Sequence, residues 1–201
     1  MEKKIRKDIN GLRALAVLSV LLFHFNPSFI PGGFVGVDVF FVISGFLMTS
    51  IIFRGMESNS FNFISFLKTR AIRIIPALLV TIVITLLAGF IFIEPLSYKI
   101  IGEHASSSLL FVSNILYWSE SGYFDLDAYN KFLLHTWSLS VEWQFYIIYP
   151  LILIVLKRYF TLNIIKNLVV LLTIIFLLFL LFYLCISLLF LISCFHLEHG
   201  S

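Results

Sequence analysis

The sequence is poor in charged residues. Asp, Glu, Lys and Arg make up only 12% of its 201 residues, against about 25% in ordinary soluble domains. Apolar residues make up 60% of the chain, and the mean hydropathy is +1.03. A domain of roughly 150 residues buries only about 70% of the surface that its unfolded chain exposes, so a soluble core cannot hide this much apolar surface. The composition therefore excludes a soluble globular domain and a disordered chain, and it predicts an integral membrane protein.

The sequence also lacks the features of several other functional classes. Its two cysteines, Cys185 and Cys194, both lie in the last apolar run, where they suit small buried hydrophobes better than a disulfide or a metal site. It has no zinc-type ligand spacing, no glycine-rich phosphate loop and no basic patch for nucleic acid, so we expect no metal and no nucleic-acid partner. The basic N-terminus precedes an apolar stretch that carries Arg13 and His24 and has no small-residue cleavage site. We interpret that stretch as a retained span rather than a signal peptide.

Long apolar runs predict transmembrane helices, because a helix needs about 20 mostly apolar residues to cross a bilayer. Five stretches are long enough: 12–30, 33–53, 74–93, 137–156 and 168–195. The stretch 106–118 is shorter, and runs of that length are more often re-entrant or interfacial. Since backbone in lipid must satisfy its own hydrogen bonds, we expect an all-α, polytopic membrane helical bundle of five to six spans.

The distribution of Lys and Arg predicts the orientation of these spans. The tail 1–13 and the linkers 54–73 and 157–167 are rich in Lys and Arg, whereas 94–136 has two Lys against five acidic residues. The positive-inside rule places the first three segments in the cytoplasm and the fourth outside. This topology has a cytoplasmic N-terminus, and it requires that 106–118 does not cross the membrane.

Three ionisable side chains fall inside predicted spans and are functional candidates, because charge in a membrane is costly. They are His24, Asp38 and Glu142. From the helix rise, each lies about five or six residues, roughly 8 Å, below the outer end of its span. We therefore expect a shared polar pocket in the outer half of the bilayer. The alternatives are a helix–helix hydrogen bond for His24 and a helix-entry role for Asp38, which follows Gly36.

Arginines mark the opposite boundary. Arg13 and His24 are separated by 11 residues, about three helical turns, so they share a face at an axial distance of roughly 16 Å. Arg70 and Arg73 form a second cationic pair at i and i+3. Guanidinium groups suit phosphate, although all three arginines could simply be positive-inside anchors. We predict that this face binds an anion at the inner boundary and does chemistry at His24.

Six motifs occur in one order along residues 8–158: INGLRALAVLSVLLFH, GGFVGVDVFFVISGFLMT, FLKTRAIRIIPA, SNILYW, GYFD and LLHTWSLSVEWQFYIIYPL. Together they resemble the acyltransferase type 3 family, the integral-membrane acyltransferases that include bacterial O-antigen and other surface-glycan O-acetylases. The resemblance implies an enzyme of the bacterial cytoplasmic (inner) membrane. Such an enzyme transfers an acyl group, usually acetyl, from acetyl-CoA to a hydroxyl of an extracytoplasmic glycan acceptor such as lipopolysaccharide.

The resemblance also implies residue roles. His24 matches the catalytic histidine of the family's Arg-x10-His motif, and Arg13 matches its partner. Arg70 and Arg73 match the Arg-x-x-Arg motif, which is expected to contact the coenzyme.

Two carboxylates match acidic positions of the family motifs. Glu142 matches the acid of WSLSVEWQFY, and Asp38 matches the acid of GVDVFF. Either would orient the imidazole of His24 and stabilise its charged form, as a carboxylate does in triad chemistry. His24 would then act as a general base or as a transient acyl carrier, and the sequence does not choose between them.

The resemblance ends near Tyr159. Beyond it the chain is a low-complexity Leu, Phe and Ile run, and members of the family have more spans than this chain. We therefore divide the chain into 1–158, the N-terminal part of a membrane acyltransferase domain, and 159–201, an atypical hydrophobic span and tail, and we expect a missing C-terminal half as a partner. Two alternatives stay open: a truncated, non-catalytic remnant or assembly partner, and a membrane transport component that uses the buried charges as a proton relay.

Overall fold

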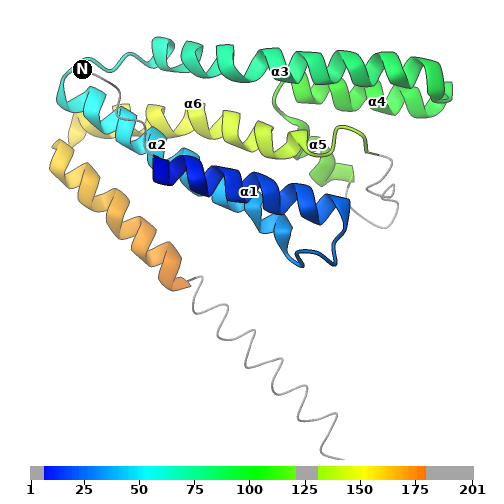
Figure 1. Cartoon of the computed structure of the whole chain (residues 1–201). Helices are drawn as coiled ribbons and strands as arrows, with labels where there is room; N and C mark the ends of the chain where they lie inside the picture. The colour runs from blue at the N-terminus through cyan, green and yellow to red at the C-terminus, as the bar shows by residue number, and fades with distance from the viewer. Residues whose placement is uncertain (1–6, 121–130, 180–201) are drawn as a thin grey trace, which may run out of the picture. The chain divides into compact units, whose positions relative to one another are not determined.

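A computed structural model describes residues 7–120 and 131–179, and these residues form helices without any β-strand. Five helices in this part are long and apolar enough to cross a membrane (Figure 1): Lys7–Phe25, Gly33–Glu57, Phe63–Phe92, Thr136–Tyr159 and Leu162–Phe179. The prediction of an all-α, polytopic membrane protein is therefore confirmed. The membrane orientation stays a prediction.

The chain divides into two compact units, Met1–Pro150 and Leu151–Ser201, and the division falls within the sequence of helix α6 (Thr136–Tyr159). The first unit contains every residue predicted for the site. The second contains the end of α6 and the helix Leu162–Phe179. The rest of the predicted span 168–195, with both cysteines, lies outside the described residues.

A turn joins helices α1 (Lys7–Phe25) and α2 (Gly36–Glu57) by way of the short 3-10 helix η1 (Gly33–Val35). Helix α1 ends five residues before the predicted limit of its span. The reason is the pair Asn26-Pro27, because proline disfavours helical backbone in the residue before it. The Asn26 side chain instead accepts a hydrogen bond from the backbone N–H of Ser28 at 3.0 Å.

Glycines let α1 and α2 approach closely. A Cβ on Gly36 would lie 2.5 Å from the carbonyl oxygen of Ala16, and a Cβ on Gly33 would meet the carbonyl oxygen of Ser19. Membrane helices use small residues in this way, since packing rather than the hydrophobic effect drives their association in lipid. The position of α1 therefore depends on the absence of side chains at these two sites.

Helix α3 (Phe63–Phe92) begins well before the predicted span at 74. Asn62 caps it by accepting a hydrogen bond from the backbone N–H of Ser65 at 3.0 Å, which satisfies one of the free donors at a helix start. The segment that sequence reasoning treated as a linker therefore continues the helix, and it carries Arg70 and Arg73 on α3.

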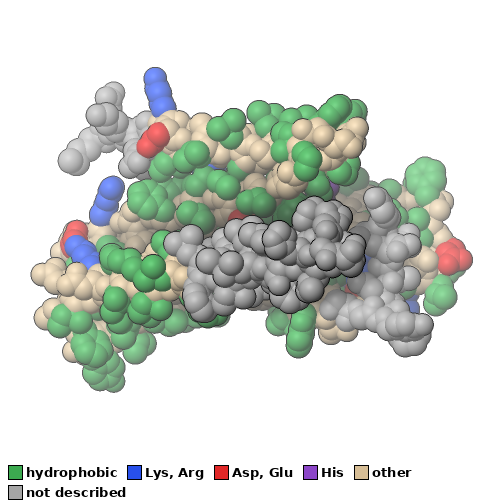
Figure 2. All heavy atoms as spheres, turned by 90° about the horizontal axis from the view of Figure 1, so that it is seen from below, with side chains coloured by type: hydrophobic (Ala, Val, Ile, Leu, Met, Phe, Trp, Pro, Cys, Tyr) green, Lys and Arg blue, Asp and Glu red, His purple; other side chains and the backbone are tan. Residues whose placement is uncertain are grey.

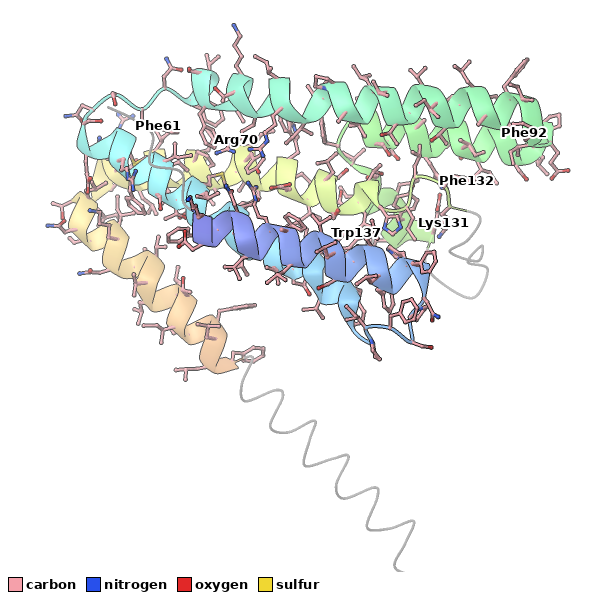
Figure 3. The ribbon with its side chains drawn as sticks, in the orientation of Figure 1. Phe61, Arg70, Phe92, Lys131, Phe132 and Trp137 are labelled. Atoms are coloured by element: carbon pink, nitrogen blue, oxygen red, sulfur yellow. The ribbon has the colours of Figure 1, made fainter. Side chains whose placement is uncertain are left out.

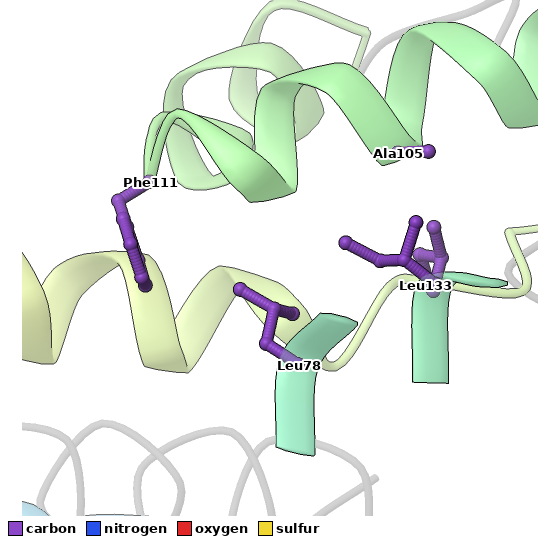
Figure 4. Close-up of a cluster of buried hydrophobic side chains, with 5 residues drawn as sticks. Leu78, Ala105, Phe111 and Leu133 are labelled. Carbon is purple, nitrogen blue, oxygen red and sulfur yellow. The ribbon is translucent and has the colours of Figure 1, made fainter. Parts of the chain in front are cut away.

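Helix α4 (Pro95–Leu109) packs along the C-terminal half of α3 (Figure 1). A cluster of buried side chains joins these two helices to the segment around Leu133 (Figure 4): Leu78, Ile82, Ala105, Phe111 and Leu133. Leu139 and Trp143 of α6 pack against the cluster. This core fixes α3, α4 and the start of α6.

The region predicted as re-entrant or interfacial is a pair of short helices, α4 and α5 (Ser113–Glu120). The backbone between them reverses at Phe111, which adopts a left-handed φ of 55°. Neither helix is among the five that could cross a membrane. The predicted limits, 106–118, were too narrow, because α4 begins at Pro95.

Much of the described surface is apolar. Figure 2 shows hydrophobic side chains over much of one face, and side chains such as Val42, Ile72 and Phe90 are 65–75% exposed. Hydroxyls on these helices are satisfied locally, as where Thr81 and Thr85 donate to the carbonyl oxygens four residues earlier. Such a surface suits contact with lipid.

Candidate functional site

His24 lies in the last turn of α1, where it contacts a second histidine. The ring centroids of His24 and His135 are 4.7 Å apart, and their planes are tilted by 59°. His135 immediately precedes α6, which begins at Thr136. Desolvation, and then the nearby His24, lower the pKa of His135 below its usual 6.5. The sequence analysis did not single out His135.

Glu142 is on α6, and its side chain contacts α2. Its Oε1 accepts two hydrogen bonds, from the hydroxyl of Ser44 on α2 and from that of Tyr146 one turn later on α6, both at 2.5 Å. Ser44 is 8% exposed and Tyr146 is 5% exposed. The carboxylate is therefore held by hydroxyl donors in a partly buried position, where an unsatisfied charge would be costly.

The guanidinium of Arg70 lies over the ring of Tyr146, one of the two hydroxyl donors to Glu142. Its guanidinium carbon is 5.5 Å from the ring centroid of Phe66 and 5.4 Å from that of Tyr146. Both distances are within the range of a cation–π contact. Arg70 points from α3 toward α6 (Figure 3). Tyr146 thus contacts Arg70 through its ring and Glu142 through its hydroxyl, so it connects two of the predicted site residues.

Arg13, Arg73 and Asp38 have fewer contacts. Arg13 is half-buried on α1, and its Nε is buried with no hydrogen-bond partner. Arg73 on α3 and Asp38 in the first turn of α2 are exposed. Within residues 7–120 and 131–179, none of these side chains forms an ion pair. The arginines therefore have free donors to offer to an anion.

The structure connects these residues in two groups. One contains His24 and His135, and the other contains Glu142, Tyr146 and Arg70. No hydrogen bond in the described part joins His24 to either carboxylate. A pocket shared by His24, Asp38 and Glu142 stays a prediction.

Sequence reasoning also missed a buried charged cluster around His104. Both carboxylate oxygens of Glu120 lie 3.0–3.1 Å from Nε2 of His104, and Oε2 lies 3.6 Å from Nζ of Lys131. His104 is 1% exposed and Lys131 is 6% exposed. Beside them, burial raises the pKa of Tyr117 to about 12. No single motif contains His104, Glu120 and Lys131. The one sequence signal was that His104 precedes three consecutive serines on α4, which indicates a polar face on that helix.

Next to the His104 cluster, hydroxyl and amide side chains form further hydrogen bonds between α4, α5 and α6. The hydroxyls of Ser108, Thr136, Ser113 and Ser140 follow one another at 2.7–3.1 Å. Next to them, Gln144 Nε2 donates to the carbonyl oxygen of Phe111 at 2.9 Å. These bonds hold the start of α6, and with it His135, against the helix pair α4–α5.

Among the described residues, no three His, Cys, Asp or Glu side chains are grouped to hold a metal ion.

A family model described as an acyltransferase domain matches residues 6–197. The chain belongs to this acyltransferase family. The matched range contains all six predicted site residues and His135, and it extends past Tyr159 into the second compact unit.

Curated relatives in the acyltransferase family are named O-acetyltransferases. The chain is 37% identical over 166 residues to O-acetyltransferase OatA of Staphylococcus aureus (strain NCTC 8325 / PS 47), which covers 80% of this chain and 27% of that protein. It is 39% identical over 159 residues to peptidoglycan O-acetyltransferase OatA of Listeria monocytogenes serovar 1/2a, covering 78% of this chain and 25% of that protein. The chain thus spans about a quarter of the length of these relatives. No solved structure gives a significant match.

Proposed function

We propose that the chain forms a membrane-embedded O-acyltransferase site that moves an acyl group from acyl-CoA to a hydroxyl of an extracytoplasmic glycan. Membership of the acyltransferase family supports the reaction class, and the names of the relatives support acetyl as the group. One observation carries the proposal. Helix α1 holds both an exposed imidazole, His24, and a buried guanidinium nitrogen without a protein partner, on Arg13.

Acyl-CoA, most simply acetyl-CoA, is the donor in this proposal, and its thioester supplies the activated acyl group. The unpartnered Nε of Arg13 and the absence of ion pairs at Arg70 and Arg73 in the described residues fit an anionic ligand. These three arginines would hold the phosphates of the coenzyme, since a guanidinium fork matches phosphate geometry. Phe66 and Tyr146 would fix the guanidinium of Arg70 for this contact.

The acceptor in this proposal is a glycan outside the cytoplasm. One relative is named a peptidoglycan O-acetyltransferase, which favours peptidoglycan over the lipopolysaccharide that the motif resemblance suggested. The proposal keeps the N-terminus in the cytoplasm and the chain in the bacterial cytoplasmic membrane. It rests there on the positive-inside distribution of Lys and Arg.

His24 is the reacting side chain of the proposal. As a general base it would take the proton of the glycan hydroxyl while the hydroxyl oxygen attacks the thioester carbonyl, and it would return that proton to the departing thiolate. As an acyl carrier its unprotonated nitrogen would attack the thioester carbonyl and expel the coenzyme A thiolate, and the acyl group would then pass from that nitrogen to the glycan oxygen while the freed imidazole takes up the hydroxyl proton. Glu142, held by Ser44 and Tyr146, would act on the donor side by way of Arg70, and Asp38 is the carboxylate left to stabilise the charged form of the imidazole.

Transfer by the chain in membrane vesicles tests the proposal. Vesicles containing the chain receive acetyl-CoA labelled in the acetyl group and peptidoglycan fragments, and the label in O-acetyl esters is counted. We expect ester formation that is lost in His24→Ala and kept in Ser19→Ala, a matched change on the same helix. Ester formation that survives His24→Ala would overturn the role of His24.

The same vesicles separate a catalytic chain from a non-catalytic partner. A chain that supplies only the donor site would bind labelled CoA in an Arg13-dependent way and form no ester. Label that stays on the protein without acceptor, and is absent from His24→Ala, would select the acyl carrier over the general base. Vesicles with neither binding nor ester formation would refute the proposed function for this chain.

A further inference from the structure

The contact between His24 and His135 brings two helix ends together. His24 lies in the last turn of α1, and His135 lies one residue before the first turn of α6. The backbone carbonyls at a helix C-terminus carry a partial negative charge, and the N–H groups at a helix N-terminus carry a partial positive charge. The N-terminus of α6 therefore disfavours a positive charge on His135.

Two further effects favour the neutral form of His135. Desolvation lowers the pKa of its imidazole, and the neighbouring His24 lowers it further, because two imidazolium ions in contact repel each other. A neutral imidazole has one nitrogen that accepts a hydrogen bond and one that donates. His135 can thus offer an acceptor nitrogen to His24.

His24 has no other orienting partner in the described part of the chain. Glu142 is engaged by Ser44 and Tyr146, and Asp38 forms no hydrogen bond there. The second ring that contacts His24 is Phe23, at a centroid distance of 5.6 Å, and it has no acceptor. A histidine in acid–base or nucleophilic chemistry needs a partner that fixes which ring nitrogen carries the proton.

We propose that His135 is this positioning residue: its neutral ring accepts a hydrogen bond from one nitrogen of His24 and leaves the other nitrogen unprotonated toward the reacting group. The two rings are tilted by 59° and form no hydrogen bond with each other in the structure, and the proposal requires that they turn so that a nitrogen of each faces the other across the centroid distance of 4.7 Å. The inference rests on the proposed function of His24, and it adds a residue whose role is separable from packing. The hydroxyl chain that holds the start of α6 would keep His135 in place.

Two substitutions at His135 separate positioning from packing. His135→Phe keeps an aromatic ring against His24 and removes the acceptor, whereas His135→Asn keeps a neutral acceptor and removes the ring. If His135 positions His24, the Phe variant loses about 100-fold in ester formation rate, and the Asn variant recovers most of it. If the ring only packs, the Phe variant is active and the Asn variant is weak, which would overturn the inference.

Nitrogen NMR tests the pair without any substrate. The chain is labelled with 15N-histidine in detergent micelles, and the ring nitrogen shifts of His24 are assigned by comparison with His24→Ala. We expect the two nitrogens of His24 to differ strongly, as in a single tautomer, and to average in His135→Phe but not in His135→Asn. Helical circular dichroism confirms that each variant is folded.

The two readouts keep the hypotheses apart. A fixed His24 tautomer that depends on His135, in a chain that forms no ester, would support the pair and refute the proposed function. An ester-forming chain whose His24 shifts ignore both substitutions would refute the pair and leave the proposed function standing.

Discussion

Gly36→Ala tests whether the α1–α2 contact sets the position of His24. The added Cβ would lie 2.5 Å from the carbonyl oxygen of Ala16, which is 0.9 Å short of the 3.4 Å at which ordinary contact begins. It would also lie 2.8 Å from the side chain of Val20. Because the nearest atom is backbone, it cannot turn away, and α1 and α2 must separate.

The magnitude follows from comparison with Gly45→Ala. Gly45 is on the same helix, and a Cβ there meets nothing within 4 Å, so this change should stabilise α2 by up to about 1 kcal/mol through helix propensity. Overpacking at Gly36 should cost about 1–3 kcal/mol. The unfolding free energies of the two variants should therefore differ by about 2–4 kcal/mol.

Unfolding in mixed micelles measures this difference. Each variant is titrated with sodium dodecyl sulfate while helical circular dichroism is followed, and the free energies are extrapolated to the same detergent composition. We expect Gly36→Ala to reduce ester formation as well, because displacement of α1 moves His24 from His135. Stabilities that agree within about 0.5 kcal/mol would refute the close approach of the two helices.

Three further outcomes follow from the described contacts. Tyr146→Phe removes one of the two hydroxyl donors to Glu142 and should lower the unfolding free energy by about 1.5–3 kcal/mol, measured in the same detergent titration; no change would mean that the bond does not form. Met48→Ala, at a fully buried position, should lower the unfolding free energy by about 2 kcal/mol. This is the low end for such truncations, because lipid solvates apolar groups as well as a core does. The control Val42→Ala, at an exposed position, should lower it by less than about 0.5 kcal/mol. The imidazole of His135 should titrate below 6.5 by NMR. Its contribution to stability is intact above pH 6.5 and falls as the pH drops through 6.5 toward the lowered pKa, since the unfolded chain binds the proton more tightly.

Span number and helical class could be predicted from the sequence, because lipid imposes both through length and hydropathy. The span limits depended on local chemistry that hydropathy does not measure. Helix α1 ends at Phe25, before the pair Asn26-Pro27, and α3 extends back through the arginines to the cap at Asn62. Both signals were present in the sequence as a proline and as a capping residue.

The site was less predictable, because its contacts join distant parts of the chain. Tyr146 is four residues from Glu142, so the spacing predicts that they meet on one helix face. Ser44 is 98 positions from Glu142, and the motif that contains it does not show which residue it meets. His135 likewise meets His24 only because the end of α1 and the start of α6 are packed together. Ser44, His135 and Tyr146 all lie within the quoted motifs, but only the fold shows which residue each of them contacts.

The ion pair between Glu120 and Lys131 has a consequence for how the protein can vary. Oxygens of the same carboxylate lie 3.0 Å from Nε2 of buried His104 and 3.6 Å from Nζ of buried Lys131. Removal of one partner from a buried ion pair costs about 3–5 kcal/mol because it leaves a buried charge uncompensated, whereas replacement of the whole group by apolar side chains of similar volume can be neutral. Single substitutions at these positions should therefore be more destabilising than a joint apolar replacement. The contact of α4 and α5 with the segment that leads into α6 can thus vary as a unit, but not one residue at a time.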